Sequence, residues 1–320
     1  MENLHKNLDV ANLELEQDSF EVLEKSAGLD AEEILRPATT YWQDSWRRFK
    51  SNKLALISML FIIIATFASF LVPAVWKYDL ATIDFSRINL KPNFDHLFGT
   101  DFYGRDIFVR VMYGMRISLI IAFAATILNL VIGVLYGSIA GFAGGRVDAL
   151  MMRFVDILYS VPMQIYVILI MVAMGDNKAG ILPIVIALGV ASWLSMARIV
   201  RGETMQLKES EFVLAAKTLG AKNRRILFKH LLPNAMSSII VTATLLIPSA
   251  IFTESFLSYI GIGISPPEAS LGTLVAEAMQ IYQQQPYQLI IPALAISLII
   301  FAFNLLGDGL RDALDPKMSR

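Results

Sequence analysis

Three acidic residues, Asp156, Glu254 and Asp308, lie in or beside strongly apolar stretches, where a carboxylate is costly unless it faces water or a partner. Such acids could serve proteolysis inside a membrane, but catalysis needs further groups at fixed spacing. The chain has no HExxH zinc motif, and residues 306–309 do not reproduce the glycine-x-glycine-aspartate pattern of membrane aspartyl proteases. Its three histidines are His5, His96 and His230. The sequence therefore argues against an enzyme and predicts no catalytic residue and no metal site.

Four polar residues inside apolar stretches are candidates for a translocation path. They are Asn129, Gln164, Glu254 and Asn304. Hydrogen bonds between helices are the commoner use of such side chains, and lining a path is the less common one. Both uses remain open for these four residues.

Nucleotide binding has no basis in this sequence. A phosphate-binding loop would read G-x-x-x-x-G-K-[ST], and the lone Lys217-Thr218 pair lacks the preceding glycines. The chain also has no cysteine, which excludes disulfides and thiolate metal sites, and its net charge of −1 gives no electrostatic case for nucleic acid. We therefore expect any ATP and its Mg²⁺ to be bound by separate subunits.

The elements that position these residues are membrane spans, because 55% of the 320 residues are hydrophobic and only 17% are charged. A bilayer core needs about 20 apolar residues in a helix. Six stretches qualify, at residues 54–75, 117–140, 157–174, 181–200, 235–258 and 289–306. The third is the shortest and contains Pro162, and the fifth contains Pro248, which suits helices packed against neighbours.

Charge distribution predicts the orientation of these spans. Basic residues precede the first span at 47–53, follow the last at 311–320 and crowd the linker between the fourth and fifth, which places both termini and this linker in the cytoplasm. The first 36 residues carry ten acids, without the basic start and apolar core of a cleavable signal. Residues 77–113 carry five cations yet fall outside the cell in this topology. Within them Arg105 and Asp106, which can pair, are expected to cap and anchor the second span rather than contact cargo.

The linker at residues 202–234, here called the elbow, is too long and polar for a simple turn. Residues 203–219 contain neither glycine nor proline and predict a helix, Gly220 can adopt the left-handed geometry that ends one, and a second helix should run from 222 to 232 before Pro233 stops it. Small residues Ala215 and Ala216 allow a partner to approach, and the surrounding cations can pair with its acids. The same charges equally suit a loop lying on the anionic inner leaflet.

The elbow resembles the coupling loop of ABC importer permeases, with an alanine pair, a glycine four residues on, and an apolar run closed by proline. That loop usually has an acid before the alanines, where this chain has Leu214. HLFGTDFYGRDIFVRVMYGMRISL from His96, RVDALMMRFVDILYSVP from Arg146, ASWLSMARIVRGE from Ala191, GIGISPP from Gly261 and FNLLGDGLRDALDP from Phe303 are similar to successive segments of the oligopeptide and dipeptide permeases, the OppC/DppC-like branch.

The resemblance implies an all-α membrane protein of the type I ABC importer permease fold, with six transmembrane helices and a cytoplasmic two-helix coupling loop, in the bacterial cytoplasmic membrane. It implies a homologous second permease, two ATPase subunits and an extracytoplasmic peptide-binding protein as partners. Permeases for nickel, haem or antimicrobial peptides are related, and a secondary transporter remains the alternative outside this class.

Residue assignments follow from this resemblance. The residues assigned to ATPase coupling are Leu214, Ala215, Ala216, Lys217, Gly220, Ala221, His230 and Pro233. The chain is expected to divide into an acidic tail at 1–45, a first helix at 46–76, an extracytoplasmic segment at 77–113, a five-helix core at 114–310 that contains the elbow, and a cytoplasmic tail at 311–320.

Overall fold

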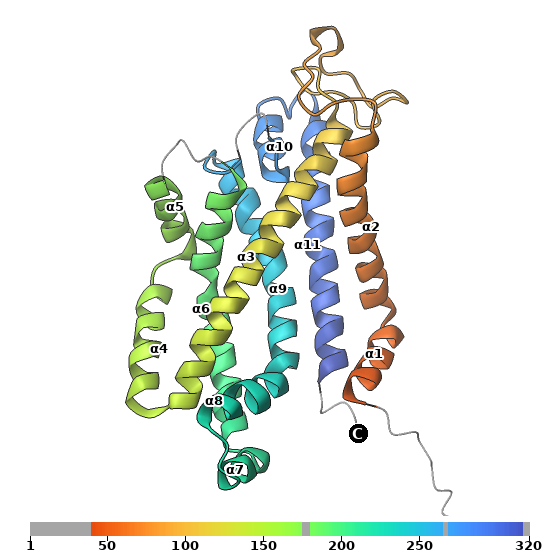
Figure 1. Ribbon diagram of the computed structural model, residues 1–320. Coiled ribbons are helices and arrows are strands. Elements are labelled where there is room, and N and C mark those ends of the chain that lie inside the picture. The colour runs from red at the N-terminus through yellow and green to blue at the C-terminus, as the bar shows by residue number, and fades with distance from the viewer. Residues whose placement is uncertain (1–39, 175–179, 265–267, 316–320) are drawn as a thin grey trace, which may run out of the picture. The chain divides into compact units, whose positions relative to one another are not determined.

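The computed structural model describes residues 40–174, 180–264 and 268–315. The expected acidic tail, the basic residues Lys317 and Arg320, and the double proline of GIGISPP lie outside these residues. The chain divides into two units after Asp44, and the helical bundle belongs to the second unit, which begins at Ser45. Its helices, with α1 crossing the division, are α1 Tyr41–Ser51, α2 Lys53–Val75, α3 Ile107–Ala143, α4 Gly145–Tyr159, α5 Met163–Met174, α6 Ile181–Lys208, α7 Glu211–Thr218, α8 Asn223–Arg225, a π-helix Ile226–Leu231, α9 Leu232–Tyr259, α10 Leu271–Ala278 and α11 Pro286–Leu314 (Figure 1).

Five helices of the described residues are long and apolar enough to cross a membrane. They are α2, α3, α6, the continuous helix from Asn223 to Tyr259, and α11. The predicted third span, 157–174, is wrong as a single helix, because α4 ends at Tyr159 and α5 starts at Met163 with a bend of 84°. Pro162 lies in this break, has no amide to donate and disfavours helical geometry at Val161. Neither α4, of 15 residues, nor α5, of 12, is among the five; if the bent pair is one span, it makes the sixth crossing.

Two further boundaries differ from the sequence expectation. The first elbow helix does not run from 203 to 219, because α6 continues to Lys208 and α7 begins only at Glu211. Pro233 does not stop the second elbow helix either. It occupies the first turn of α9, where a missing backbone amide costs least. The second arm of the elbow therefore continues directly into a membrane-spanning helix.

A seam of glycines brings α3 and α6 into close contact. Gly133, Gly137 and Gly141 are spaced four residues apart, so they share one face of α3. A Cβ at Gly133 would lie 2.6 Å from Met196 Cβ, one at Gly141 would lie 2.6 Å from the Arg201 carbonyl oxygen, and one at Gly137 would collide with the Ala197 carbonyl. Small residues at this spacing let helix backbones approach closely in membranes.

Replacing Gly137 with valine should sharply reduce the amount of folded protein, because the side chain can fit only if α3 and α6 separate. Overpacking of this kind costs about 1–3 kcal/mol. The measurement is the yield of monodisperse protein extracted from membranes. Gly202→Ala is the matched control, since a Cβ at this helical position meets nothing within 4 Å. Equal yields for the two variants would contradict the close packing of the seam.

The two largest of several apolar clusters in the bundle hold its helices together. One gathers side chains from α2, α3, α9, α10 and α11, among them Ile251, Leu271 and Phe303. The other gathers side chains from α3, α5, α6 and α9, among them Ile121 and Leu188. At one end lie α10 and the segment between α2 and α3, here called the connector (residues 76–106), and at the other end lies α7 (Figure 1). The two polar sites described next lie at these opposite ends.

Candidate functional site

The elbow bends at Gly220 as the sequence predicted. Its φ of +79° lies in the left-handed region, which glycine enters at no steric cost. Around it the Gly220 amide donates to the Lys217 carbonyl at 2.9 Å and the Ala221 amide donates to the Ala216 carbonyl at 3.0 Å. These are the two bonds of a Schellman motif, which satisfy carbonyls at the end of α7. The bend is therefore fixed by the chain's own hydrogen bonds.

The two arms of the elbow share a small apolar core of their own. Val213 and Ala216 from α7 pack against Ile226, Leu227 and Leu231 from the π-helix. Where α6 meets the elbow, the Lys208 ammonium donates to the Phe142 carbonyl at 2.7 Å and so joins the elbow to the end of α3. Shared packing and this tether make the elbow a single compact unit.

The tip of the elbow exposes apolar side chains among cations. Leu219 is 87% exposed and Leu214 is 53% exposed. Lys222, Arg224, Arg225 and Phe228 line an open groove of about 430 Å³ beside them. Apolar groups on a loop rimmed by charge mark an interaction site. Leu219 and Phe228 were not among the predicted coupling residues, although their apolar character in a polar linker was a signal that could have revealed them.

The predicted coupling residues occupy different parts of the elbow. Leu214, Ala215 and Lys217 face outward from α7, whereas Ala216 is buried against the second arm. Gly220 and Ala221 form the bend itself. The remaining pair lies farther along the chain: His230 is half-buried in the π-helix, where its carbonyl accepts from the Asn234 amide nitrogen at 2.5 Å, and Pro233 begins α9.

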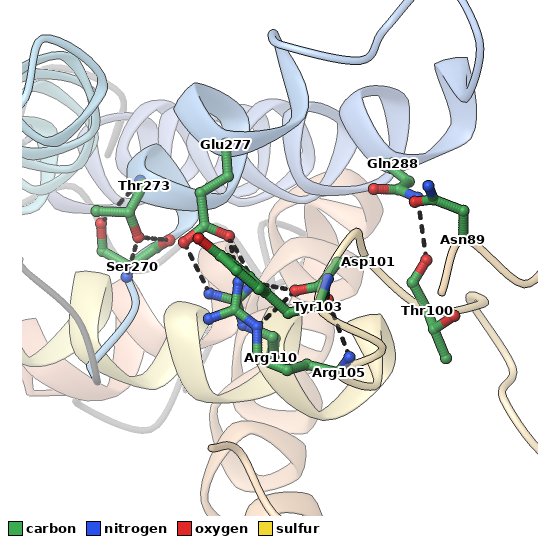
Figure 2. Close-up of polar contacts among 10 residues, drawn as sticks. All are labelled: Asn89, Thr100, Asp101, Tyr103, Arg105, Arg110, Ser270, Thr273, Glu277 and Gln288. Atoms are coloured by element: carbon green, nitrogen blue, oxygen red, sulfur yellow. Dashed lines mark hydrogen bonds and ion pairs between the residues drawn. The ribbon is translucent and has the colours of Figure 1, made fainter. Parts of the chain in front are cut away.

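A buried cluster of four charges, here called the ionic cluster, joins the connector to α10 at the opposite end (Figure 2). Its members are Asp101, Arg105, Arg110 and Glu277. The Asp101 carboxylate accepts from Arg105 and Arg110 at 2.7 Å each, and the Glu277 carboxylate accepts from Arg105 at 2.9 Å and from Arg110 at 2.6 and 3.1 Å. Two acids and two guanidinium groups compensate one another in a site where Arg110 is only 3% exposed.

Neighbouring bonds extend this attachment. Asp106 accepts from the Val109 amide at 3.0 Å and so caps α3, as expected, and its other oxygen lies 2.8 Å from His96 Nδ1. Arg105, which the sequence suggested could pair with Asp106, bonds Asp101 and Glu277 instead. The Gln288 amide on α11 donates to Asn89 and to the Thr100 carbonyl, both at 3.0 Å (Figure 2). The connector is thus bonded to α10 and α11 at several points.

The four candidates for a translocation path lie on four different helices. Glu254 on α9 is fully buried and accepts from Ser118 of α3 at 2.7 Å and from Ser258 at 2.8 Å, a structural use that joins two helices. Asn129 on α3 is also buried, while Gln164 on α5 and Asn304 on α11 are exposed. No hydrogen bond among the described residues joins any two of them.

Comparison with known proteins gives two matches to family models. Residues 133–320, which contain the elbow, match the model of the binding-protein-dependent transport system inner membrane component. Residues 40–92, which contain α2, match the N-terminal TM domain of oligopeptide transport permease C.

Curated relatives extend over almost the whole chain. The oligopeptide transport system permease protein OppC of Bacillus subtilis (strain 168) is 47% identical over 320 residues, which is 100% of both chains. The dipeptide transport system permease protein DppC of the same organism is 45% identical and covers 95% of this chain and 94% of its own. OppC of Haemophilus influenzae is 42% identical over 290 residues, or 89% of this chain and 92% of its own.

One solved structure supports the fold. A chain of the MetNI methionine ABC transporter in an inward-facing conformation aligns with 64% of this chain and 96% of its own, with a TM-score of 0.50 and 20% identity. At this identity the likeness concerns the fold alone. It agrees with the all-helical type I importer permease fold that the sequence predicted.

Proposed function

The chain belongs to the family of binding-protein-dependent transport system inner membrane components, and we propose that it is one of two membrane subunits of an ATP-driven importer of peptides. The predicted resemblance to the oligopeptide and dipeptide permeases is confirmed. Identity of 47% and 45% to an oligopeptide and a dipeptide permease supports peptide as the cargo. Nickel, haem and antimicrobial peptides are the alternative cargoes, because specificity in this class resides largely in the external receptor.

The single observation that carries the mechanism is the elbow, with a rigid core and an apolar, basic tip. We infer that the tip docks into an ATPase subunit, with Leu214, Leu219 and Lys217 in contact and Ala216, Gly220 and Ala221 fixing the bend. Closure of two ATPases on ATP would then move two elbows together and turn the path outward, and hydrolysis would reset it. Because its arms share a core, the elbow transmits this motion as one body.

The subunit itself is proposed to be non-catalytic, with ATP and Mg²⁺ held by its partners. The lack of a phosphate-binding loop in the sequence supports this assignment. Basic residues in the elbow and at 47–53 support cytoplasmic termini and a cytoplasmic elbow, by the positive-inside rule, in the cytoplasmic membrane of a bacterium. The connector then faces outward, on the side where a peptide-binding protein delivers cargo.

Purification of the tagged chain from its native membrane tests this proposal. We expect a second permease and two ATPase subunits to co-purify, and vesicles containing this complex and its receptor to take up peptides only with ATP. A chain that purifies alone and transports without ATP would be a secondary carrier. Uptake of nickel or haem in place of peptides would keep the ATP-driven mechanism and change the cargo.

A further inference from the structure

The break between α4 and α5 places irregular backbone inside an apolar stretch of the chain. Residues 160–162 separate the two helices, and Pro162 has no amide to offer. On the α4 side, the Ser160 amide donates to the Asp156 carbonyl at 3.0 Å and the Val161 amide donates to the Leu158 carbonyl at 3.3 Å, and on the α5 side the Ile165 amide donates to the Pro162 carbonyl at 2.9 Å. At membrane depth, non-helical backbone is tolerated where it is buried in protein or lines a cavity that holds water.

A cavity of about 320 Å³ lies against this break. Tyr159, Pro162 and Tyr166 form one wall, and Ser192 and Ser195 of α6 form another. Ser249 of α9 closes the third side. Its volume is in the range of cavities that hold small ligands, about 300–1,000 Å³.

The lining of this cavity offers hydroxyls and no charge. Among the described residues that line it there are three serines and two tyrosines, and no acidic or basic side chain. Tyr166 donates to the Ala191 carbonyl at 3.0 Å, while Ser192 donates only to the Met163 sulfur at 3.4 Å, a weak acceptor that a ligand can replace. Hydroxyls both donate and accept, so the wall can bond amide and carbonyl groups alike.

We propose that this cavity is a station on the translocation path where the main chain of the imported peptide binds, an inference that rests on the proposed function. Every peptide residue other than proline carries one amide donor and one carbonyl acceptor, whatever its side chain. Hydroxyls can bond these groups, and an uncharged wall repels neither acidic nor basic side chains. Gln164, a predicted path residue, adjoins Met163 of this lining.

Thiol labelling tests the cavity directly, because the chain has no cysteine of its own. In the complete complex, the thiol introduced by Ser195→Cys should react with a water-soluble methanethiosulfonate roughly tenfold or more faster than that of Val190→Cys, because thiolates form in water. Val190 lies on the same helix outside the cavity and is 44% exposed. Ser249→Cys reports the facing wall and should react as Ser195→Cys does. Equal rates at positions 190, 195 and 249, or reaction only with an apolar reagent as in a site for a lipid acyl chain, would overturn the proposal.

Protection of the introduced thiol from labelling distinguishes a wrong cargo assignment from a wrong cavity assignment. Peptide, receptor and ATP together should slow labelling of Ser195→Cys and leave Val190→Cys unchanged. If nickel or haem protects and peptide does not, the proposed cargo fails while the station stands. If the complex's transported cargo gives no protection, the station is wrong, whatever that cargo is.

Introducing either an acid or a base at position 195 tests whether the imported peptide passes this residue. Ser195→Asp should raise the uptake of a trilysine peptide relative to a triglutamate peptide, and Ser195→Lys should lower this ratio, because a charge beside the path then selects among side chains. Receptor affinity for both peptides is measured in parallel and should not change. A ratio that stays constant in both variants would place the passing peptide elsewhere.

Discussion

Replacing Gly220 with valine should strongly reduce ATP-driven uptake, while the protein still inserts and the complex still hydrolyses ATP. A Cβ here meets nothing within 4 Å, so the cost comes from the backbone, held at φ +79°. Left-handed geometry costs an L-residue about 1–2 kcal/mol. Every 1.4 kcal/mol is about a tenfold shift in population. The bend should therefore open and aim α7 away from the ATPase, which uptake and ATP hydrolysis measured in the same vesicles would detect.

Two controls isolate the bend. Gly220→Asn should keep most of the uptake, because asparagine enters left-handed geometry more readily than valine. Gly202→Val places the same side chain in open space at a helical position of α6, at the start of the elbow, and should have little effect on coupling. The coupling assignment fails if the Gly220→Val complex assembles and transports as the unaltered one does.

Removing the Arg110 guanidinium should strongly destabilise the protein. Arg110 is almost fully buried, and its loss would leave the carboxylates of Asp101 and Glu277 with only Arg105 between them. Removing one partner of a buried ion pair lowers the free energy of unfolding by about 3–5 kcal/mol, because the other charge is left uncompensated. We expect Arg110→Ala to lower the melting temperature of the protein in detergent markedly and to reduce uptake, because only the Arg105–Glu277 pair of the ionic cluster then attaches the connector to α10.

A double-mutant cycle distinguishes loss of the ionic cluster from loss of one side chain. Arg110→Ala together with Glu277→Ala should cost less than the sum of the two single changes, because they share one network. Lys77→Ala is the matched control, since its pair with Asp95, at 2.7 Å, is exposed and lies in the same connector. Additive costs, or equal effects of Lys77→Ala and Arg110→Ala, would show that the cluster does not hold the connector.

Most of the membrane spans could be predicted from the sequence, because the thickness of the bilayer fixes the length of an apolar helix. The first predicted span, 54–75, differs from α2 by one residue. The second began ten residues late, at 117 in place of Ile107, in a region where Arg110 and Arg116 interrupt the apolar run. Only the partners Asp101 and Glu277 make Arg110 tolerable near the span, and Glu277 lies 167 residues away in sequence.

Local backbone chemistry explains the other successes and failures. Glycine's freedom at Gly220 made the bend predictable, whereas proline was ambiguous: Pro162 breaks a crossing and Pro233 begins a helix. The four-residue spacing of the glycines in α3 could have predicted the seam, but it was not used. The ionic cluster and the cavity at the α4–α5 break were not readable, since each depends on segments far apart in the chain.

The seam between α3 and α6 also restricts how the subunit can move. Backbones that touch at three successive turns block small translations, because any partial shift pushes a Cβ-bearing residue against a carbonyl. Sliding would have to occur in whole turns of about 5.4 Å. We therefore expect the two helices to move together as one lever, which would keep Ser195 at a constant distance from α3.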